Sequence, residues 1–444
     1  MNNRIIELLA SRQFSLLREE ISHLNSVDLA DTLTELDGRS GSMVLRLLKK
    51  DMAAEVFSYL SSAQQQKIVE TISDQVLQEI MEEMYFDDLI DFLEEMPANL
   101  VKRLVATTSA QERNLINQFL QYPAGSAGSI MTIELVALEQ DLPVDEALRQ
   151  IRRNGPDKET IYTCYVVSRQ RVLEGAVSLR SLVLSGPELT VADLMERNTI
   201  SVTTRTDQEE VARLVRKYGL MSIPVVDMEN RLVGIITVDD ILDVVEEENT
   251  EDFQKMAAIF PDMDLYLEST PWSLARNRLP WLLILMISAS LSAGIIRHFE
   301  DVLSTVVLLA ASIPMLMDTA GNAGSQSSTL IIRGMATGEI LLRDFAGVIW
   351  KEFRVSILVG LSLAVVNLAR MLFLGSPLPV ALTVSLTMIL TVILAKMIGG
   401  TLPILAKRMK LDPAIMAGPL ITTIVDGVSL YVYFTIAARL MGLA

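Results

Sequence analysis

The sequence predicts a multidomain protein: an all-α superhelical N-domain, a tandem α/β pair, an acidic connecting helix and a five-helix transmembrane domain. Three observations carry this prediction. Helical repeats fill residues 1–122, two similar strand-rich units fill 125–248, and long apolar stretches fill 272–444. The connecting helix is placed at 249–271, with a start as early as residue 238. A chain of 444 residues with a mean hydropathy of +0.36 has room for both a soluble and a membrane part.

The charge is divided unevenly between the two halves. Residues 1–270 hold 25 basic and 47 acidic side chains, whereas residues 271–444 hold 13 basic and 8 acidic ones. An acidic soluble part argues against nucleic acid and favours cations or basic partners. Cys164 is the only cysteine, so neither a disulfide framework nor a thiolate metal site is expected. The first twenty residues lack a long apolar core and do not form a signal peptide, so we expect the soluble part in the cytosol.

The N-terminal segment is built from a weak repeat. Similar short units begin at Asp28, Asp51, Asp74 and Asp88, and the first two steps are 23 residues long. Aspartate is a good helix N-cap, and apolar residues follow each one at helical spacing. Such repeats are typical of a small superhelix. The fourth unit has more carboxylates than capping needs, although a solvated helix face remains the better explanation for them.

Residues 125–248 change to β-branched runs separated by helical stretches. The runs are 162–167, 175–179, 222–227 and 232–238. Gly175 and Gly234 are 59 residues apart, as are Ser178 and Thr237, which predicts two copies of a βαββα unit.

The stretch "SIPVVDMENRLVGIITVDDIL" in the second copy resembles a module of a tandem cystathionine-β-synthase (CBS) pair. In such modules a Thr and an Asp, here Thr237 and Asp240, often contact the ribose or phosphate of an adenine nucleotide. The resemblance therefore implies ATP or another adenine nucleotide at these two residues. The first copy has Ser181 where the Asp would stand, so it implies one such site. A purely structural pair remains the alternative.

The segment that follows carries a dense run of acidic residues directly before the membrane part. They are Asp239, Asp240, Asp243, Glu246, Glu247, Glu248, Glu251 and Asp252. Like charges repel at i,i+4 on a helix, and Mg²⁺ or Ca²⁺ bound to their oxygens would relieve the repulsion. A solvated charge run is the competing interpretation.

Five apolar segments follow, each longer than the roughly 20 residues that span a membrane. They are 279–299, 302–332, 349–374, 378–406 and 413–442. Basic residues cluster before the first segment, between the second and third, and between the fourth and fifth. The positive-inside rule then predicts a multi-pass protein of the inner cell membrane, with the N-terminus in the cytosol and the C-terminus outside.

Polar residues inside these segments concentrate in the second and the fifth. Asp318 and Asn322 lie in the second, and Thr422 lies one helical turn before Asp426 in the fifth. A carboxylate in the membrane costs about 2.5–3.5 kcal/mol and usually faces a water-filled path or the bundle interior. Such a group can hold a hydrated Mg²⁺ through its waters. Lys396 in the fourth segment is the one basic residue deep enough to pair with Asp426, and that pairing stays open.

Two motifs, "GNAGSQSSTLIIRG" and "DPAIMAGPLITTIVD", resemble the MgtE family of magnesium channels and transporters, and the likeness covers nearly the whole chain. It implies a Mg²⁺-selective channel, embedded in lipid as a homodimer, with Asp426 recognising hydrated Mg²⁺ in a pore between the subunits. It also implies that the connecting helix is a plug that closes the pore when Mg²⁺ binds the soluble domains. The implied metal ligands there are Asp88, Asp91, Asp239, Asp243, Glu247, Glu248, Asp252 and Asp412.

Two other function classes remain open. A proton- or sodium-coupled divalent cation carrier would use Asp318 and Asp426 as coupling sites. A membrane-anchored CBS nucleotide sensor would need no polar residues inside its spans. An enzyme is least favoured, because the sequence has no phosphate-binding P-loop, zinc-protease or nucleophile-elbow motif.

Overall fold

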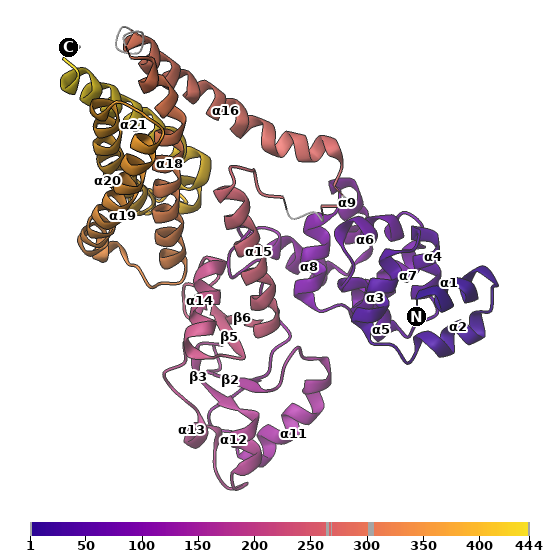
Figure 1. Ribbon diagram of the computed structural model, residues 1–444. Coiled ribbons are helices and arrows are strands. Elements are labelled where there is room, and N and C mark those ends of the chain that lie inside the picture. Colours follow the sequence, from indigo (N-terminus) through magenta and orange to yellow (C-terminus); the bar gives the residue numbers. More distant parts are fainter. Residues whose placement is uncertain (1, 263–265, 268, 301–305, 443–444) are drawn as a thin grey trace. The chain divides into compact units, whose positions relative to one another are not determined.

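The computed structural model describes residues 2–262, 266–267, 269–300 and 306–442 (Figure 1). The chain forms two compact units, Met1–Val245 and Glu246–Ala444. Each unit has its own apolar core, and each is described by itself below.

Unit 1 begins with a purely helical region, as the repeat predicts. Its helices are α1 (Asn2–Ala10), α2 (Phe14–Ile21), α3 (Ser26–Thr34), α4 (Gly38–Leu45), α5 (Lys50–Ser58), α6 (Ser62–Val69), α7 (Asp74–Glu83), α8 (Phe86–Glu95), α9 (Ala98–Thr107) and α10 (Ala110–Phe119). Their apolar faces form one core, in which the rings of Phe57 and Phe92 meet edge to face at 5.2 Å.

The repeated aspartates do not cap these helices, so that part of the prediction is wrong. Asp28, Asp51 and Asp88 lie in the first turns of α3, α5 and α8, and Asp74 is the first residue of α7. The cap position before α3 is held by Asn25, whose side chain accepts from the amide of Val27. Carboxylates in a first turn still favour the helix, because they face its positive dipole end.

The second region of unit 1 contains two three-stranded sheets of the same topology. The first repeat has β1 (Ala137–Leu138), α11 (Val144–Asn154), β2 (Thr163–Val167), β3 (Leu173–Ser178), α12 (Leu179–Leu184) and α13 (Val191–Leu194). The second has β4 (Val202–Thr203), α14 (Gln208–Tyr218), β5 (Ser222–Val226), β6 (Leu232–Thr237) and the start of α15 (Val238–Met256). In each sheet the first strand runs parallel to the second and the third antiparallel, which confirms the predicted pair.

The glycines 59 residues apart occupy matching positions where other backbone comes close. A Cβ on Gly175 would lie 2.8 Å from the carbonyl oxygen of Glu196, and one on Gly234 would lie 2.7 Å from that of Thr132. Neither position therefore accepts a side chain, which explains why the glycine recurs in both repeats.

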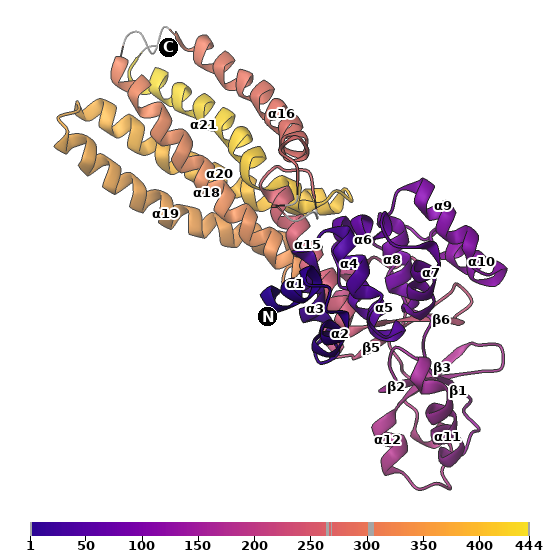
Figure 2. The same ribbon diagram turned by 90° about the vertical axis from the view of Figure 1, so that its right-hand side faces the viewer.

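The described residues of unit 2 form the last part of α15 and five long helices. These are α16 (Pro271–His298), α18 (Val307–Ala336), α19 (Phe345–Phe373), α20 (Leu378–Arg408) and α21 (Gly418–Leu440). Figure 2 shows α18, α19, α20 and α21 side by side in one bundle, and each of α18, α19 and α21 packs on α20. Among the described residues, four helices are long and apolar enough to cross a membrane: α16, α19 with the turn before it, α20 and α21. The more polar α18 is not one of them, so five spans remain a prediction.

The acidic connecting segment contains one described helix, α15, which begins at Val238 and ends at Met256. The predicted range 249–271 therefore includes the last turns of α15 and the residues after it, of which 263–265 and 268 lie outside the described part.

Candidate functional site

An acidic cluster lies in unit 1 where α8, the start of α15 and the loop before β2 meet. We define the acidic cluster as Asp87, Asp88, Asp91, Glu159, Asp239, Asp240 and Asp243. Four of the predicted metal ligands, Asp88, Asp91, Asp239 and Asp243, are therefore brought together. Glu247, Glu248 and Asp252 lie further along α15 in unit 2.

Several carboxyl groups of the acidic cluster have pKa values above those of the same groups in water. Burial, followed by the negative charge of Asp240, raises the pKa of Asp87 well above its usual range. Burial and the same neighbour raise the pKa of Glu159 to about 8. Burial also raises the pKa of Asp240 to about 6, although hydrogen bonds from Thr237 oppose the shift. Neutralising this charge requires protons or a cation.

The acidic cluster is open rather than closed around an ion. In the described part of the chain, no three Asp, Glu, His or Cys side chains converge closely enough to hold a metal. Asp87 is 7 % exposed, whereas Asp91 and Asp239 remain exposed to solvent. The arrangement therefore supplies many oxygens at the edge of water, which suits cations that keep part of their hydration shell.

The predicted nucleotide residues lie at the edge of this cluster. The Thr237 hydroxyl donates to the Asp240 carboxylate at 2.5 Å, and the Thr237 amide donates to the same oxygen at 3.2 Å. These hydrogen bonds lie within the first turn of α15, and other carboxylates lie close to the pair. Those charges would repel a phosphate group.

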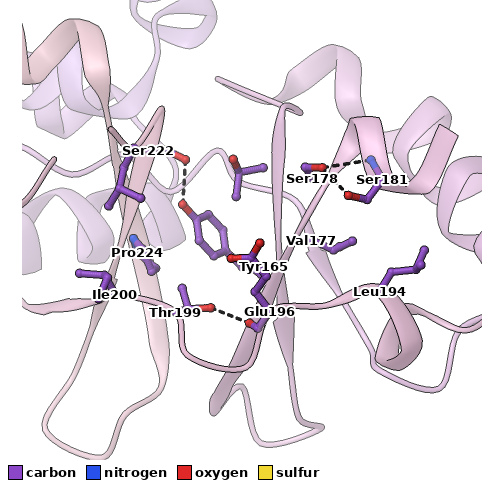
Figure 3. A pocket seen from close by; sticks show the side chains of 13 residues that line it. Tyr165, Val177, Ser178, Ser181, Leu194, Glu196, Thr199, Ile200, Ser222 and Pro224 are labelled. Carbon is purple, nitrogen blue, oxygen red and sulfur yellow. Dashed lines mark hydrogen bonds between the residues drawn. The ribbon is translucent and has the colours of Figure 1, made fainter. Parts of the chain in front are cut away.

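A pocket of about 180 Å³ lies instead between the two repeats, around the corresponding residues of the first copy (Figure 3). Ser178 and Ser181 line it, and their hydroxyls are 2.8 Å apart. Tyr165 and Ser222 line the opposite side and join the repeats by a 2.7 Å hydrogen bond between their hydroxyls. The other residues lining it are Thr163, Ala176, Val177, Leu194, Glu196, Thr199, Ile200, Leu220 and Pro224.

In unit 2, the intramembrane carboxylate predicted to matter lies between α21 and α18. Asp426 is half-buried, and a Cβ on Gly321 would lie 3.6 Å from its Oδ1 and 3.2 Å from a methyl carbon of Thr422. Gly321 therefore lets α18 approach both polar residues of α21. The Thr422 hydroxyl donates to the carbonyl of Pro419 at 2.9 Å, so its oxygen can still accept a hydrogen bond.

The second carboxylate, Asp318, is close enough to Asp426 for their charges to repel. Its Oδ1 accepts a hydrogen bond from Asn322 at 3.2 Å. Both begin a polar stripe on α18, defined as Asp318, Asn322, Gln326, Thr329 and Arg333, all exposed in the single chain. Their spacing of three or four residues places them on one helix face.

Lys396 does not pair with Asp426, the possibility that the sequence left open. Its Nζ donates to the Ser327 hydroxyl at 3.2 Å, and no ion pair of the described residues includes Asp426. Asp426 thus has a second carboxylate nearby and no basic partner in the described chain.

Lys255 in the last turn of α15 forms an ion pair with Asp412, which precedes α21 in the chain. Lys255 Nζ lies 2.6 Å from Asp412 Oδ2 and 2.5 Å from Glu251 Oε1. Burial alone would lower the pKa of Lys255, but hydrogen bonds to these carboxylates outweigh it and raise the pKa. Asp412 also caps the turn at Pro413–Met416, because its side chain accepts a hydrogen bond from the amide of Ala414. The predicted ligand Asp412 is therefore engaged by an ammonium group here.

Sequence reasoning missed Glu159, Lys255 and Glu352. Glu159 lies in a loop with no motif, Lys255 is one basic residue in an acidic run, and Glu352 lies at the start of an apolar stretch. Glu352 lies between Lys351 and Arg354, so its charge did not stand out in the sequence. The other two depend on contacts that only the fold creates.

Three family models match the chain. Residues 313–436 match "MgtE: Divalent cation transporter", residues 24–125 match "MgtE intracellular N domain", and residues 127–186 and 191–247 match the CBS domain.

Several known proteins are similar over most of their length. The magnesium transporter MgtE of Thermus thermophilus is 40 % identical over 96 % of this chain and 95 % of its own. That of Bacillus subtilis is 36 % identical over 98 % and 96 %. A solved structure, the cytosolic domain of the Mg²⁺ channel MgtE in complex with ATP, is 40 % identical, with a TM-score of 0.53 over 55 % of this chain and 100 % of that one.

Proposed function

Since the chain belongs to the MgtE family of divalent cation transporters, we propose that it is a Mg²⁺-selective channel closed by Mg²⁺ on its soluble side. Its relatives carry the name of magnesium transporter, and none of these names describes an enzyme.

The observation that carries this proposal is Asp426. It is half-buried between α21 and α18, lies close to Gly321, and has the carboxylate of Asp318 nearby. A carboxylate in that position without a basic partner is expected to serve an ion path. Oxygen ligands and space for water suit Mg²⁺, which gives up its hydration shell reluctantly.

We propose that two copies of the chain enclose the path. The polar stripe of α18 is exposed in the single chain, and lipid would leave these polar groups without hydrogen bonds. A second copy related by a two-fold axis would cover the stripe and add a second Asp426. Two carboxylates across a water-filled path can hold one hydrated divalent ion.

We propose that the acidic cluster is the sensor. With little Mg²⁺, its carboxylates repel one another; with more, bridging ions favour the arrangement in which α8 and α15 lie together. Binding at several carboxylate pairs would make closure steep. Glu247, Glu248 and Asp252 would extend the sensor along α15, the proposed plug.

We propose that one adenine nucleotide binds the CBS pair; the cytosolic domain of a similar channel was solved in complex with ATP. The pocket around Ser178 and Ser181 is favoured over Thr237 and Asp240, because the latter face the acidic cluster. Calorimetry with ATP should show weaker binding for Ser181→Leu and unchanged binding for Thr237→Val. The reverse result would return the site to Thr237 and Asp240, and absent binding in the unaltered protein would make the pair purely structural.

We place the protein in the inner cell membrane with its soluble unit in the cytosol and its C-terminus outside, because basic residues flank the helices on one side. Protease added to inside-out membrane vesicles should release the soluble unit. Release of the soluble unit only from right-side-out vesicles would show the opposite orientation.

The proposal is tested by Mg²⁺ flux into liposomes that contain the full-length protein. Asp426→Asn keeps the shape of the side chain but removes its charge, and it should lower Mg²⁺ flux by about tenfold or more. Thr435→Val, on the same helix, is the matched control, because that hydroxyl bonds only to its own helix at Tyr431. Normal selective flux through the Asn variant would place the ion path elsewhere.

A further inference from the structure

Three buried polar residues inside the helix bundle of unit 2 have no part in the proposed ion site. Ser327 on α18, Glu352 on α19 and Lys396 on α20 are 1 %, 9 % and 5 % exposed. The Ser327 hydroxyl donates to Glu352 Oε2 at 2.6 Å, and Lys396 Nζ donates to Ser327 Oγ at 3.2 Å. One hydroxyl thus joins a buried carboxylate to a buried ammonium group, and we call these residues the three-helix triad.

The neighbouring residues of α20 make room for this contact. Gly399 lies one turn after Lys396, and a Cβ there would overlap the carbonyl oxygen of Gly324 on α18. A Cβ on Gly400 would lie 3.2 Å from Cγ of Glu352. Both glycines therefore allow close packing of the three helices at the level of the triad.

The triad restricts how α18 can turn or slide. Each buried charge is tolerated because the other is near and the hydroxyl satisfies both. A rotation of α18 would remove Ser327 and leave both charged groups without their hydrogen bonds. The next residue, Ser328, adds a second restraint, because its hydroxyl donates to the carbonyl of Met416 at 2.6 Å.

This restraint acts on the helix that carries the polar stripe. Ser327 is buried, whereas Asp318, Asn322 and Gln326 on the other side of α18 are exposed. We propose that the three-helix triad is a positioning device that holds the polar stripe toward the ion path and thereby sets discrimination among divalent cations. This inference rests on the proposed function.

The test compares Mg²⁺ and Co²⁺ flux through the full-length protein in liposomes. The variants are Ser327→Ala, Glu352→Gln, Lys396→Met and the double variant Glu352→Gln/Lys396→Met. Each single variant should change the Mg²⁺/Co²⁺ flux ratio by about threefold or more. The double variant should return toward the ratio of the unaltered protein, because it leaves no buried charge without its opposite charge. A ratio does not depend on how much protein is folded, so a merely structural role would not change it.

The matched control is Ser356→Ala on α19. Ser356 is as buried as Ser327, at 0 % exposure, but its hydroxyl donates within its own helix to Phe353 at 2.7 Å. Its loss should leave the flux ratio unchanged.

Two results overturn the inference: an unchanged ratio in Ser327→Ala, or a double variant whose effect equals the sum of the single ones. Ser327→Ala removes only one hydroxyl, so it decides the matter if the charge variants fail to fold. If the unaltered protein carries no divalent cation, the proposed function fails. If it carries divalent cations but the variants keep its Mg²⁺/Co²⁺ flux ratio, the proposed function stands and only the role of the three-helix triad fails.

Discussion

At the scale of single residues, Asp426 and Asp412 differ in the charged groups that surround them. Asp426 and Asp412 were both predicted metal ligands, yet Asp426 has no basic partner in the described chain, whereas Asp412 contacts Lys255. An ammonium group between two carboxylates takes the place that a cation would otherwise occupy. Lys255 therefore acts in this structure as a built-in cation that fixes the end of α15.

Replacing Lys255 tests this assignment. Lys255→Met leaves Glu251 and Asp412 facing each other without a positive charge, so the end of α15 should be held less firmly. The Mg²⁺ concentration that halves the flux should rise by about two- to fivefold, the effect expected of a partly exposed ion pair. Lys407→Met, an exposed lysine in the last turn of α20, is the control. An unchanged or lower half-inhibiting concentration in Lys255→Met would contradict the assignment.

At the scale of elements, the proposed sensor is the surface between α8 and the start of α15. Burial raises the pKa of Asp240 there to about 6 and that of Glu159 to about 8, above the values of an unfolded chain. The folded state therefore binds more protons than the unfolded one between about pH 4 and pH 8. Stability should be fully present at the acid end of that window and should fall as pH rises through it.

The melting temperature of the full-length protein checks this expectation. With chelator and no divalent ion, it should fall between pH 5 and pH 8; saturating Mg²⁺ should reduce that fall, because the cation replaces the protons. Asp88→Asn/Asp240→Asn should flatten the curve, and Asp141→Asn, at an acidic residue outside the acidic cluster, should not. A curve that rises over this range without Mg²⁺ would contradict the assignment.

The elements themselves could be predicted well from the sequence. Apolar residues at helical spacing marked the helices, and runs of β-branched residues marked the strands; all four runs correspond to strands. The aspartate caps were misplaced by one to three residues, because several residue types compete for a cap position. The polar residues of α18 and α21 were found because charge is unusual in apolar segments.

The rest of the site depends on contacts between distant segments. Glu159 joins the acidic cluster from a loop, and Ser327, Glu352 and Lys396 meet from three helices. No local pattern marks such pairs, because their sequence separations are large and each residue taken alone has an ordinary explanation.

At the scale of the whole molecule, one unit has apolar helices long enough to cross a membrane and the proposed ion path, and the other unit is rich in carboxylates. The same divalent ion would be both cargo and effector. This arrangement requires that flux follow the Mg²⁺ gradient alone and that Mg²⁺ at the soluble unit oppose it.

The most direct measurement is Mg²⁺ flux into liposomes containing the purified protein, without a proton or sodium gradient, while Mg²⁺ on the side of the soluble unit is varied. We expect flux down the Mg²⁺ gradient that falls steeply as Mg²⁺ on that side rises. Flux that begins only when a proton or sodium gradient is imposed would instead identify a coupled carrier. Absence of flux under every condition would favour a membrane-anchored sensor and contradict the role given to Asp426.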